Sequence, residues 1–239
     1  MKILLILLLI FSCSSEQQTG KTEAEILYKE AISLKEDGQY TLSNQKLNQI
    51  KSHYPYSYYA TKAELMSADI YFLQDNYIEA ASSYLIFKDM HPKNQKLDYV
   101  YLKIAESFFM QRPSTFDRDL GPCHQAIRYY DEFMFKFPNS KHIAKAKVNK
   151  SECFAMIKNK EKYIADFYYR TKVYDAAIYR YKNILQVFQD KSLKEHSMKK
   201  IIKSYSNLKK KSECNQYFNK YRPLLSKQSV DELSGVCLK

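Results

Sequence analysis

A repeated pair of amphipathic helices is the feature that most constrains the fold of this chain. Between residues 61 and 94, apolar side chains recur three or four positions apart on both sides of a break at Asp75, which is the period of two amphipathic helices. Ala68 and Ala80 lie twelve positions apart, one in each helix, so their small side chains allow the helices to approach closely. Pro92 cannot donate a backbone hydrogen bond and therefore ends the second helix. This segment is predicted to be a helical hairpin.

The same landmarks recur along the chain. Gly38 and Asp75 are 37 positions apart, and so are Pro55 and Pro92. A hairpin of about 34 residues has the length of a tetratricopeptide (TPR) repeat, and such a unit buries its faces only against neighbouring repeats. With only four Gly and six Pro, the chain offers few tight turns for a sheet-rich fold. We therefore predict an all-α, right-handed superhelical solenoid of about five TPR helix-turn-helix repeats over residues 23–225. The repeats fall at about 23–57, 61–94, 98–140, 158–190 and 192–225, and a C-terminal tail follows at 226–239.

The amino terminus predicts export. Lys2 precedes nine apolar residues, Ile3–Phe11, which are too few to span a bilayer, since a spanning helix takes about 20 residues. The segment from Ile10 to Cys13 resembles the lipobox of bacterial lipoproteins. We therefore expect a lipoprotein signal peptide at 1–12.

Cleavage before the lipobox cysteine would leave a lipidated Cys13 and a short polar tether at 13–22. Several acyl chains on one residue anchor a protein stably, where a single chain is marginal. Ser14-Ser15 follow the cysteine without the Asp that retains lipoproteins in the inner membrane, so the resemblance points to the periplasmic face of the outer membrane. The alternative is an ordinary cleaved signal with a chance cysteine.

The charge balance bears on the class of partner. The formal net charge is +12, and loss of Lys2 with the signal peptide lowers it to about +11. A surplus of this size favours anionic partners, and export argues against nucleic acid. Lysines that simply decorate solvated helix faces are the alternative explanation.

No motif for catalysis or metal binding is present. The sequence has no Gly-rich phosphate loop, no G-x-S-x-G and no H-E-x-x-H, and its five His residues are scattered. We therefore predict no enzymatic activity, no metal and no cofactor beyond the covalent lipid. Four cysteines follow Cys13, and four cysteines allow three pairings. Cys214 with Cys237 would join the last helix to the tail, Cys123 with Cys153 would link two neighbouring helices, and buried free thiols are the alternative.

Two segments are candidate contact sites. In the third repeat, Ala105 and Ala126 are 21 positions apart rather than twelve, so about nine residues are inserted, including Asp117-Arg118-Asp119. A long loop on a helical scaffold is a candidate contact site, and a plain spacer is the alternative. The run 53–59 places Tyr54, Pro55, Tyr56 and Tyr58 together, and tyrosines give contact area at low entropic cost. Packing between the first two repeats is the alternative for that run.

Taken in order, these motifs resemble the BamD family (also called ComL or YfiO) of outer-membrane assembly lipoproteins over nearly the whole chain. The segments that carry the resemblance are Tyr54-Pro55-Tyr56-Ser57, His91-Pro92, Leu97-Asp98-Tyr99-Val100-Tyr101, Asp117-Arg118-Asp119, Phe137-Pro138-Asn139-Ser140-Lys141, Glu161–Tyr169 and Tyr174–Arg180. A generic TPR protein would share the alanines but not the charged insert together with the long linking helix.

The resemblance implies a non-enzymatic subunit of the β-barrel assembly (BAM) complex. Its N-terminal half would bind the targeting segment of unfolded outer-membrane proteins, with Tyr54, Pro55, Tyr56 and Tyr58 at the substrate groove. Its C-terminal half would dock on a POTRA domain of the barrel-forming subunit BamA, through Arg180 and the insert. Contacts with smaller accessory lipoproteins are also implied, although the last repeat matches the family weakly.

Two other functions fit parts of the pattern. A TPR lipoprotein that pilots secretin or pilus assembly, or another cell-envelope scaffold, would share the solenoid and the anchor but not the insert of the third repeat. A subunit of a peptidoglycan-associated enzyme is a more distant alternative, because the sequence offers it no catalytic residue.

Overall fold

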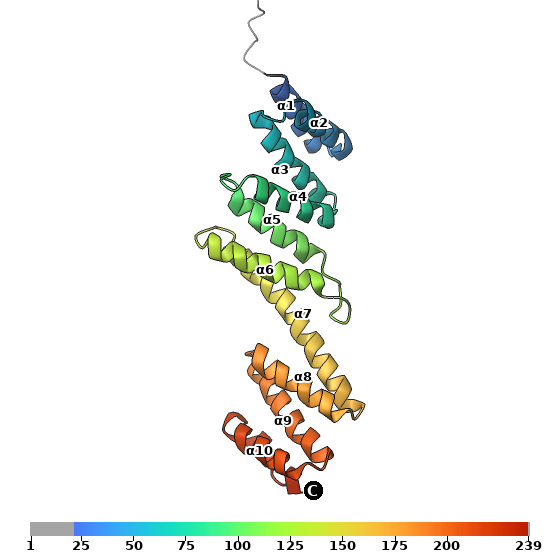
Figure 1. Ribbon diagram of the computed structural model, residues 1–239, viewed down its shortest axis with the longest axis vertical. Coiled ribbons are helices and arrows are strands. Elements are labelled where there is room, and N and C mark those ends of the chain that lie inside the picture. The colour runs from blue at the N-terminus through green and yellow to red at the C-terminus, as the bar shows by residue number, and fades with distance from the viewer. Residues whose placement is uncertain (1–21, 239) are drawn as a thin grey trace, which may run out of the picture. The chain divides into compact units, whose positions relative to one another are not determined.

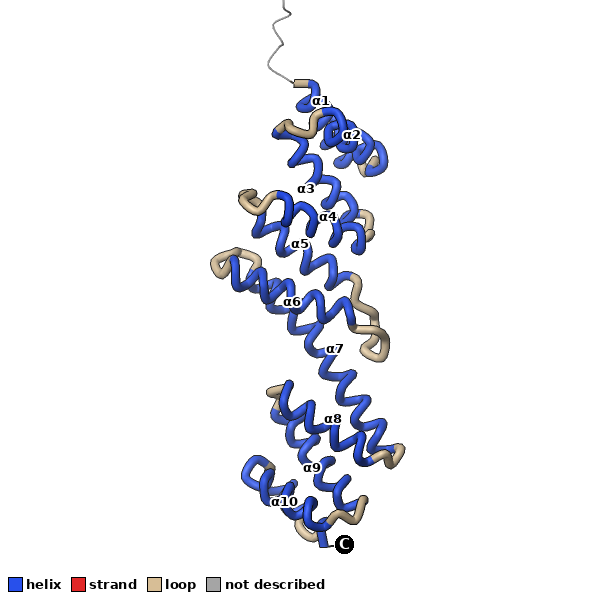
Figure 2. The backbone as a smooth tube through the Cα atoms, in the orientation of Figure 1, coloured by secondary structure: helices blue, strands red, loops and turns tan. Residues whose placement is uncertain are grey.

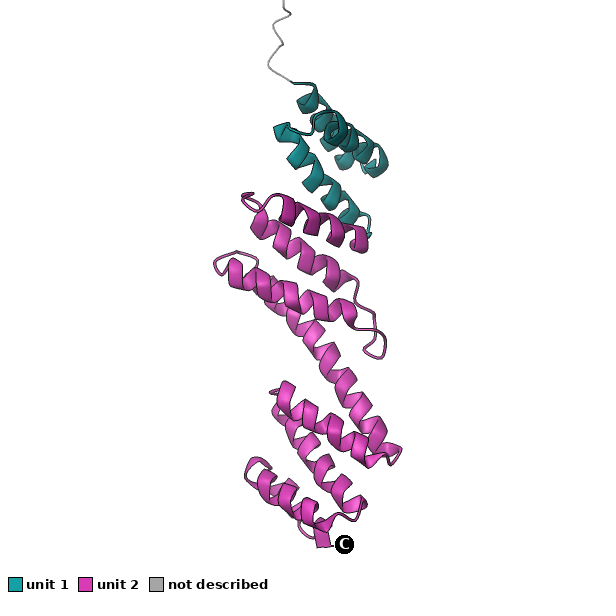
Figure 3. Ribbon diagram, viewed as in Figure 1, with its two compact units in different colours: residues 1–76 teal, residues 77–239 magenta. Residues whose placement is uncertain are grey.

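The computed structural model describes residues 22–238, and every regular element in this range is a helix (Figures 1 and 2). The all-α prediction is therefore confirmed. Cys13 and the predicted signal peptide lie outside the described residues. The helices divide into two compact units, of which the first ends at Asn76 and the second begins at Tyr77 (Figure 3).

The described residues of unit 1, 22–76, form three helices, α1 (Glu23–Glu36), α2 (Tyr40–His53) and α3 (Tyr58–Leu73). Each helix packs against the next, and α1 also contacts α3. The buried core consists of small and aliphatic side chains from all three helices, namely Ala24, Ala31, Leu47, Ile50, Ala60, Ala63, Met66 and Ile70. Thr22 and Ser57 begin α1 and α3, because each side chain accepts a hydrogen bond from a free backbone amide in the first turn.

In unit 2, residues 77–238 form eight α-helices, and successive helices from α4 to α10 pack against one another. They are α4 (Tyr77–Met90), α5 (Leu97–Met110), α6 (Gly121–Lys136), α7 (Ile143–Arg170), α8 (Tyr174–Val187), α9 (Lys191–Asn207), α10 (Lys211–Tyr221) and α11 (Lys227–Leu233). Two short 3₁₀ turns, Arg222–Leu224 and Val236–Leu238, flank α11. The predicted C-terminal tail thus contains a helix. The predicted insert is the connection between α5 and α6.

Four of the turns between successive helices share one backbone conformation. Gly38, Asp75, Lys172 and Lys209 all have positive φ, between 57° and 74°, and each lies two residues before the next helix. In each turn the following amide bonds back to the carbonyl five residues earlier, as Gln39 does to Leu34. This is the Schellman pattern that ends a helix with one left-handed residue.

Small residues lie where paired helices cross. Ala165 on α7 and Ala177 on α8 are fully buried, as the twelve-residue spacing predicts. In the first hairpin the second position is Ser43, whose hydroxyl donates to the Ala31 carbonyl at 2.7 Å, twelve residues away. A serine is tolerated in this buried position because its polar atom has a partner.

Large aromatic side chains fill the space around the crossings in unit 2. Tyr84, Phe87, Tyr130, Phe133 and Tyr181 are among the largest fully buried side chains. The Tyr130 hydroxyl accepts a hydrogen bond from the Asn149 amide at 2.9 Å, and the Tyr181 hydroxyl donates to the Asp166 carboxylate at 2.6 Å. These phenols account for part of the high tyrosine content, and they tie helices together through both area and polar contacts.

Candidate functional site

The aromatic segment between α2 and α3 is the first predicted site, and it lies wholly in unit 1. Tyr54 ends α2, and its hydroxyl donates to the Glu23 carboxylate on α1 at 2.5 Å. This hydrogen bond raises the pKa of the Tyr54 phenol. Pro55 and Tyr56 follow in the exposed turn, and Tyr56 is fully exposed at 101%. Tyr54 is thus held by the protein, while Tyr56 is free to contact a partner.

Tyr58 belongs to a cluster of three tyrosines around one lysine. The Lys62 ammonium lies 4.3 Å from the centroid of the Tyr58 ring and less than 6 Å from those of Tyr28 and Tyr59. The Tyr58 and Tyr59 rings meet edge to face at 5.6 Å, and Tyr28 and Tyr59 lie 5.5 Å apart. An ammonium over aromatic faces is attracted by their quadrupoles. Tyr58 is nevertheless 70% exposed, so the cluster presents an aromatic surface to solvent.

The insert between α5 and α6 is the second predicted site. Asp117, Arg118 and Asp119 are all exposed. A hydrogen bond from the Thr115 side chain lowers the pKa of Asp117, which keeps that carboxylate charged. The Asp119 carboxylate accepts from the Gly121 amide at 3.1 Å, at the first residue of α6. The insert is therefore an ordered loop with two carboxylates facing outward or capping the next helix.

Arg180 on α8 is the third predicted site, and α7 links it to the insert. The Arg180 guanidinium lies 3.5 Å from the Glu161 carboxylate of α7. The preceding residue, Lys160, donates to the Arg118 carbonyl of the insert at 2.5 Å. Adjacent residues of one helix thus hold the two predicted partner contacts, Arg180 and the charged insert. The guanidinium and the carboxylate are both partly exposed, so the ion pair contributes at most about 1 kcal/mol and can be exchanged for a partner's carboxylate.

The structure joins Cys214 and Cys237 in a disulfide and leaves Cys123 and Cys153 as free, buried thiols. Cys237 lies just after α11, so the disulfide ties the C-terminal segment, residues 226–238, to α10. Burial raises the pKa of the Cys123 thiol and also that of Cys153, whose thiol is hydrogen-bonded to Cys123. Of the pairings considered from the sequence, the structure contains the one between the last helix and the tail.

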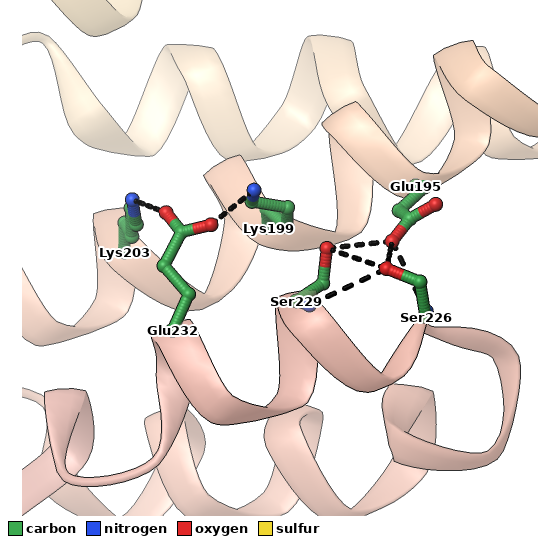
Figure 4. A network of polar contacts seen from close by, with 6 residues as sticks. All are labelled: Glu195, Lys199, Lys203, Ser226, Ser229 and Glu232. Carbon is green, nitrogen blue, oxygen red and sulfur yellow. Dashed lines mark hydrogen bonds and ion pairs between the residues drawn. The ribbon is translucent and has the colours of Figure 1, made fainter.

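Polar contacts also fasten the C-terminal segment to α9 (Figure 4). The Glu195 carboxylate accepts hydrogen bonds from the Ser226 amide and hydroxyl and from the Ser229 hydroxyl. One turn further along, Glu232 forms ion pairs with Lys199 and Lys203. These bonds lower the pKa of Glu232 to about 2. The segment covers the end of the helical stack, where a terminal repeat otherwise meets water.

Several of these contacts are not visible in the sequence. Glu23, Tyr28 and Lys62 approach the aromatic run from α1 and α3, and Glu161 approaches Arg180 from α7. The aromatic cluster lies in unit 1, and the insert and Arg180 lie in unit 2. Within residues 22–238, no helix is both long and apolar enough to cross a bilayer.

Known proteins resemble this chain over most of its length. Residues 20–220 match the family model YfiO, described as outer membrane lipoprotein. The chain is 26% identical over 217 residues to the outer membrane protein assembly factor BamD of Rickettsia prowazekii (strain Madrid E), which covers 90% of this chain and 86% of that relative. It is 28% identical over 219 residues to BamD of Neisseria gonorrhoeae, with 84% and 82% covered. Among solved structures, a tetratricopeptide repeat protein from Parabacteroides merdae ATCC 43184 covers 90% of this chain and 85% of its own length, at 14% identity and a TM-score of 0.41.

Proposed function

This chain belongs to the YfiO family of outer membrane lipoproteins, and from that premise we propose that it is a non-enzymatic subunit of the outer-membrane β-barrel assembly complex. The observation that carries the proposal is the similarity to proteins named outer membrane protein assembly factor, over more than four-fifths of this chain. A scaffold role is also consistent with the site residues, because the predicted contacts are exposed aromatic and charged side chains rather than a set of groups enclosed around a reacting atom.

We further propose that a lipid on Cys13 anchors the protein at the periplasmic face of the outer membrane. The family description as a lipoprotein supports this assignment. Residues 14–22 would then join the anchor to α1, so the helices would stand in the periplasm next to the membrane surface.

The exposed aromatic surface of unit 1 is the proposed site for unfolded outer-membrane proteins. Tyr56 and Tyr58 offer exposed rings beside the fixed Tyr54 and the rigid Pro55. Such rings can pack against the apolar side chains of an extended substrate, while their hydroxyls bond to its backbone. Substrates of this kind alternate apolar and polar residues, which suits a surface of this mixed character.

The charged surface formed by the insert and Arg180 is the proposed docking site for a POTRA domain of a BamA-like barrel protein. Lys160 and Glu161 support this proposal, because they fix the insert backbone and the guanidinium on neighbouring positions of α7. A partner carboxylate that displaces Glu161 would gain a charge-assisted hydrogen bond from Arg180. Smaller accessory lipoproteins are further proposed partners.

Affinity purification of the tagged, lipidated protein from cell envelopes in mild detergent tests the assembly role. We expect a POTRA-containing outer-membrane barrel protein to co-purify in stoichiometric yield. Recovery of a secretin or a pilus component in its place would refute the assembly role and leave the fold unaffected.

The variant Arg180→Glu tests the docking site. Charge reversal should weaken binding to a POTRA-containing fragment by at least about tenfold, because it puts like charges at the contact. The fold should persist, since partly exposed ion pairs stabilise by at most about 1 kcal/mol. Lys147→Glu is the matched control, because Lys147 is an exposed cation on α7 outside the proposed site. Equal affinities of the two variants and the wild-type protein, measured by calorimetry, would rule out the Arg180 contact.

A further inference from the structure

Unit 2 contains a pocket of about 420 Å³ that the predicted site residues do not line. Its floor comes from two helices. Lys162, Asp166 and Arg170 follow one another at intervals of four on α7, and His196 and Lys200 do the same on α9. Residues four apart on a helix share one face, so both helices direct this polar row into the same pocket.

Asp166 is the carboxylate in this floor, and it already has its partners. It accepts hydrogen bonds from Lys162 at 2.6 Å, from His196 at 2.7 Å and from the Tyr181 hydroxyl at 2.6 Å. Burial alone would raise its pKa, but the hydrogen bonds from His196, Lys162 and Tyr181 lower it well below the usual value. Asp166 therefore stays charged, and both of its carboxylate oxygens accept hydrogen bonds.

Arg170 and Lys200 remain without a carboxylate. Across residues 22–238, no acidic group lies within ion-pair distance of either cation. The Lys200 ammonium lies over the ring of Tyr169, 3.8 Å from its centroid. Burial and the nearby charges of Lys203, Lys162 and Lys199 lower the pKa of Lys200, although Asp166 opposes the change. The pocket lining thus carries three cations, Lys162, Arg170 and Lys200, against one carboxylate, Asp166.

Aromatic rings form one wall of the pocket. Phe116, from the insert, and Tyr163, from α7, meet edge to face with their centroids 6.0 Å apart. Tyr163 is about half exposed, at 49%, so its ring is accessible from the pocket mouth. The bond from Lys160 to the Arg118 carbonyl holds the insert, and with it Phe116, against α7.

We propose that this pocket binds an acidic side chain of a partner polypeptide, with an adjacent apolar or aromatic side chain of the same segment packed on Phe116 and Tyr163. Arg170 and Lys200 supply the complementary positive charge. A bound carboxylate would pair with these two cations, neither of which forms an ion pair with Asp166. The aromatic wall favours a peptide over a simple inorganic anion, because a peptide can place an apolar side chain beside its carboxylate.

Fluorescence anisotropy with the full-length protein in non-ionic detergent tests this proposal. The probes are two short labelled peptides that differ in a single residue, one with Phe-Asp and one with Phe-Asn at its centre. The Phe-Asp peptide should bind about tenfold more tightly, which is the size expected for a charge-assisted contact. This comparison uses the wild-type protein alone, so it does not depend on the folding of any variant.

Three variants locate the binding site. Arg170→Gln and Lys200→Gln should each remove most of the preference for the Phe-Asp peptide. Lys191→Gln, which removes an exposed charge from the same helix as Lys200 outside the pocket, should keep it. Circular dichroism verifies that each variant is folded.

Three results would overturn the proposal. The first is equal affinity for the two peptides, and the second is an unchanged preference in both pocket variants. The third is displacement of the labelled Phe-Asp peptide by inorganic phosphate or acetate as effectively as by the unlabelled peptide, which would make the pocket a site for free anions. None of these results depends on what co-purifies from envelopes, so the pocket and the assembly role can fail separately.

Discussion

Loss of the disulfide between Cys214 and Cys237 should loosen the C-terminal segment without unfolding the rest of unit 2. The segment contributes Leu233, which is almost completely buried, to the last core cluster. The Ser206 hydroxyl also donates to the Val236 carbonyl at 2.7 Å. These contacts remain when the disulfide is removed, so the segment should still occupy its site but should leave it more often.

The expected effect of removing the disulfide follows from the length of the loop that it closes. The two cysteines are 23 residues apart, and in the chain-entropy account a loop of that length restricts the opened state by about 3.4 kcal/mol. Since 1.4 kcal/mol is a factor of ten, removal of the cross-link should raise the equilibrium population of the opened segment by about 300-fold.

Hydrogen exchange measured by mass spectrometry is the appropriate assay, because it reports local opening. Exchange should accelerate in peptides from residues 226–238 when the wild-type protein is reduced with dithiothreitol, and also in the variant Cys214→Ser/Cys237→Ser. Peptides from α5 provide the internal control, because that helix lies outside the core cluster of the C-terminal segment. Unchanged exchange in 226–238, with loss of the disulfide verified by mass, would refute the reasoning and assign the stability of the segment to its polar and apolar contacts.

Two further predictions concern titratable groups. Hydrogen bonds from Lys199 and Lys203 lower the pKa of Glu232 to about 2, from 4.5, so this carboxylate stabilises the fold above about pH 4.5 and loses that effect as the pH falls through its folded pKa. Calorimetry should therefore find that Glu232→Gln melts at a lower temperature than the wild type at about pH 6, and that the difference in melting temperature narrows towards about pH 2. A difference in melting temperature that does not change with pH would contradict this linkage. Burial raises the pKa of both Cys123 and Cys153, so a thiol reagent at neutral pH should modify them only after unfolding. Rapid modification of the folded protein would show that the two thiols are accessible.

The hairpins could be predicted from the sequence because their signals are local. The interval between Gly38 and Asp75 marks two turns, and both residues have positive φ. Lys172 and Lys209 are separated by the same 37 positions and adopt the same conformation. Their residue type does not indicate a turn, because lysine is not typical of the left-handed region. The repeat interval of 37 positions therefore identifies these two turns, whereas the residue type does not.

The contacts around the candidate sites could not be predicted in the same way. Tyr54 through Tyr58 are contiguous, so the sequence groups them, but Glu23 approaches Tyr54 from 31 residues away. The basic pocket combines an insert residue with side chains from α7 and α9. Its Asp166–His196 contact spans 30 residues. Such long-range proximity follows from how the helices pack, which the periodicity of each helix alone does not specify.

Because α7 is one continuous helix, insertions and deletions within it should be tolerated less well than those in the loops between helices. It runs for 28 residues from Ile143 to Arg170 and packs against both α6 and α8. A single residue deleted within it would rotate everything that follows by about 100° and shift it by about 1.5 Å. That rotation would separate Lys160 from the insert or Glu161 from Arg180. Helix α7 should therefore accept only insertions or deletions that restore its phase, such as seven residues, which come within about 20° of two full turns.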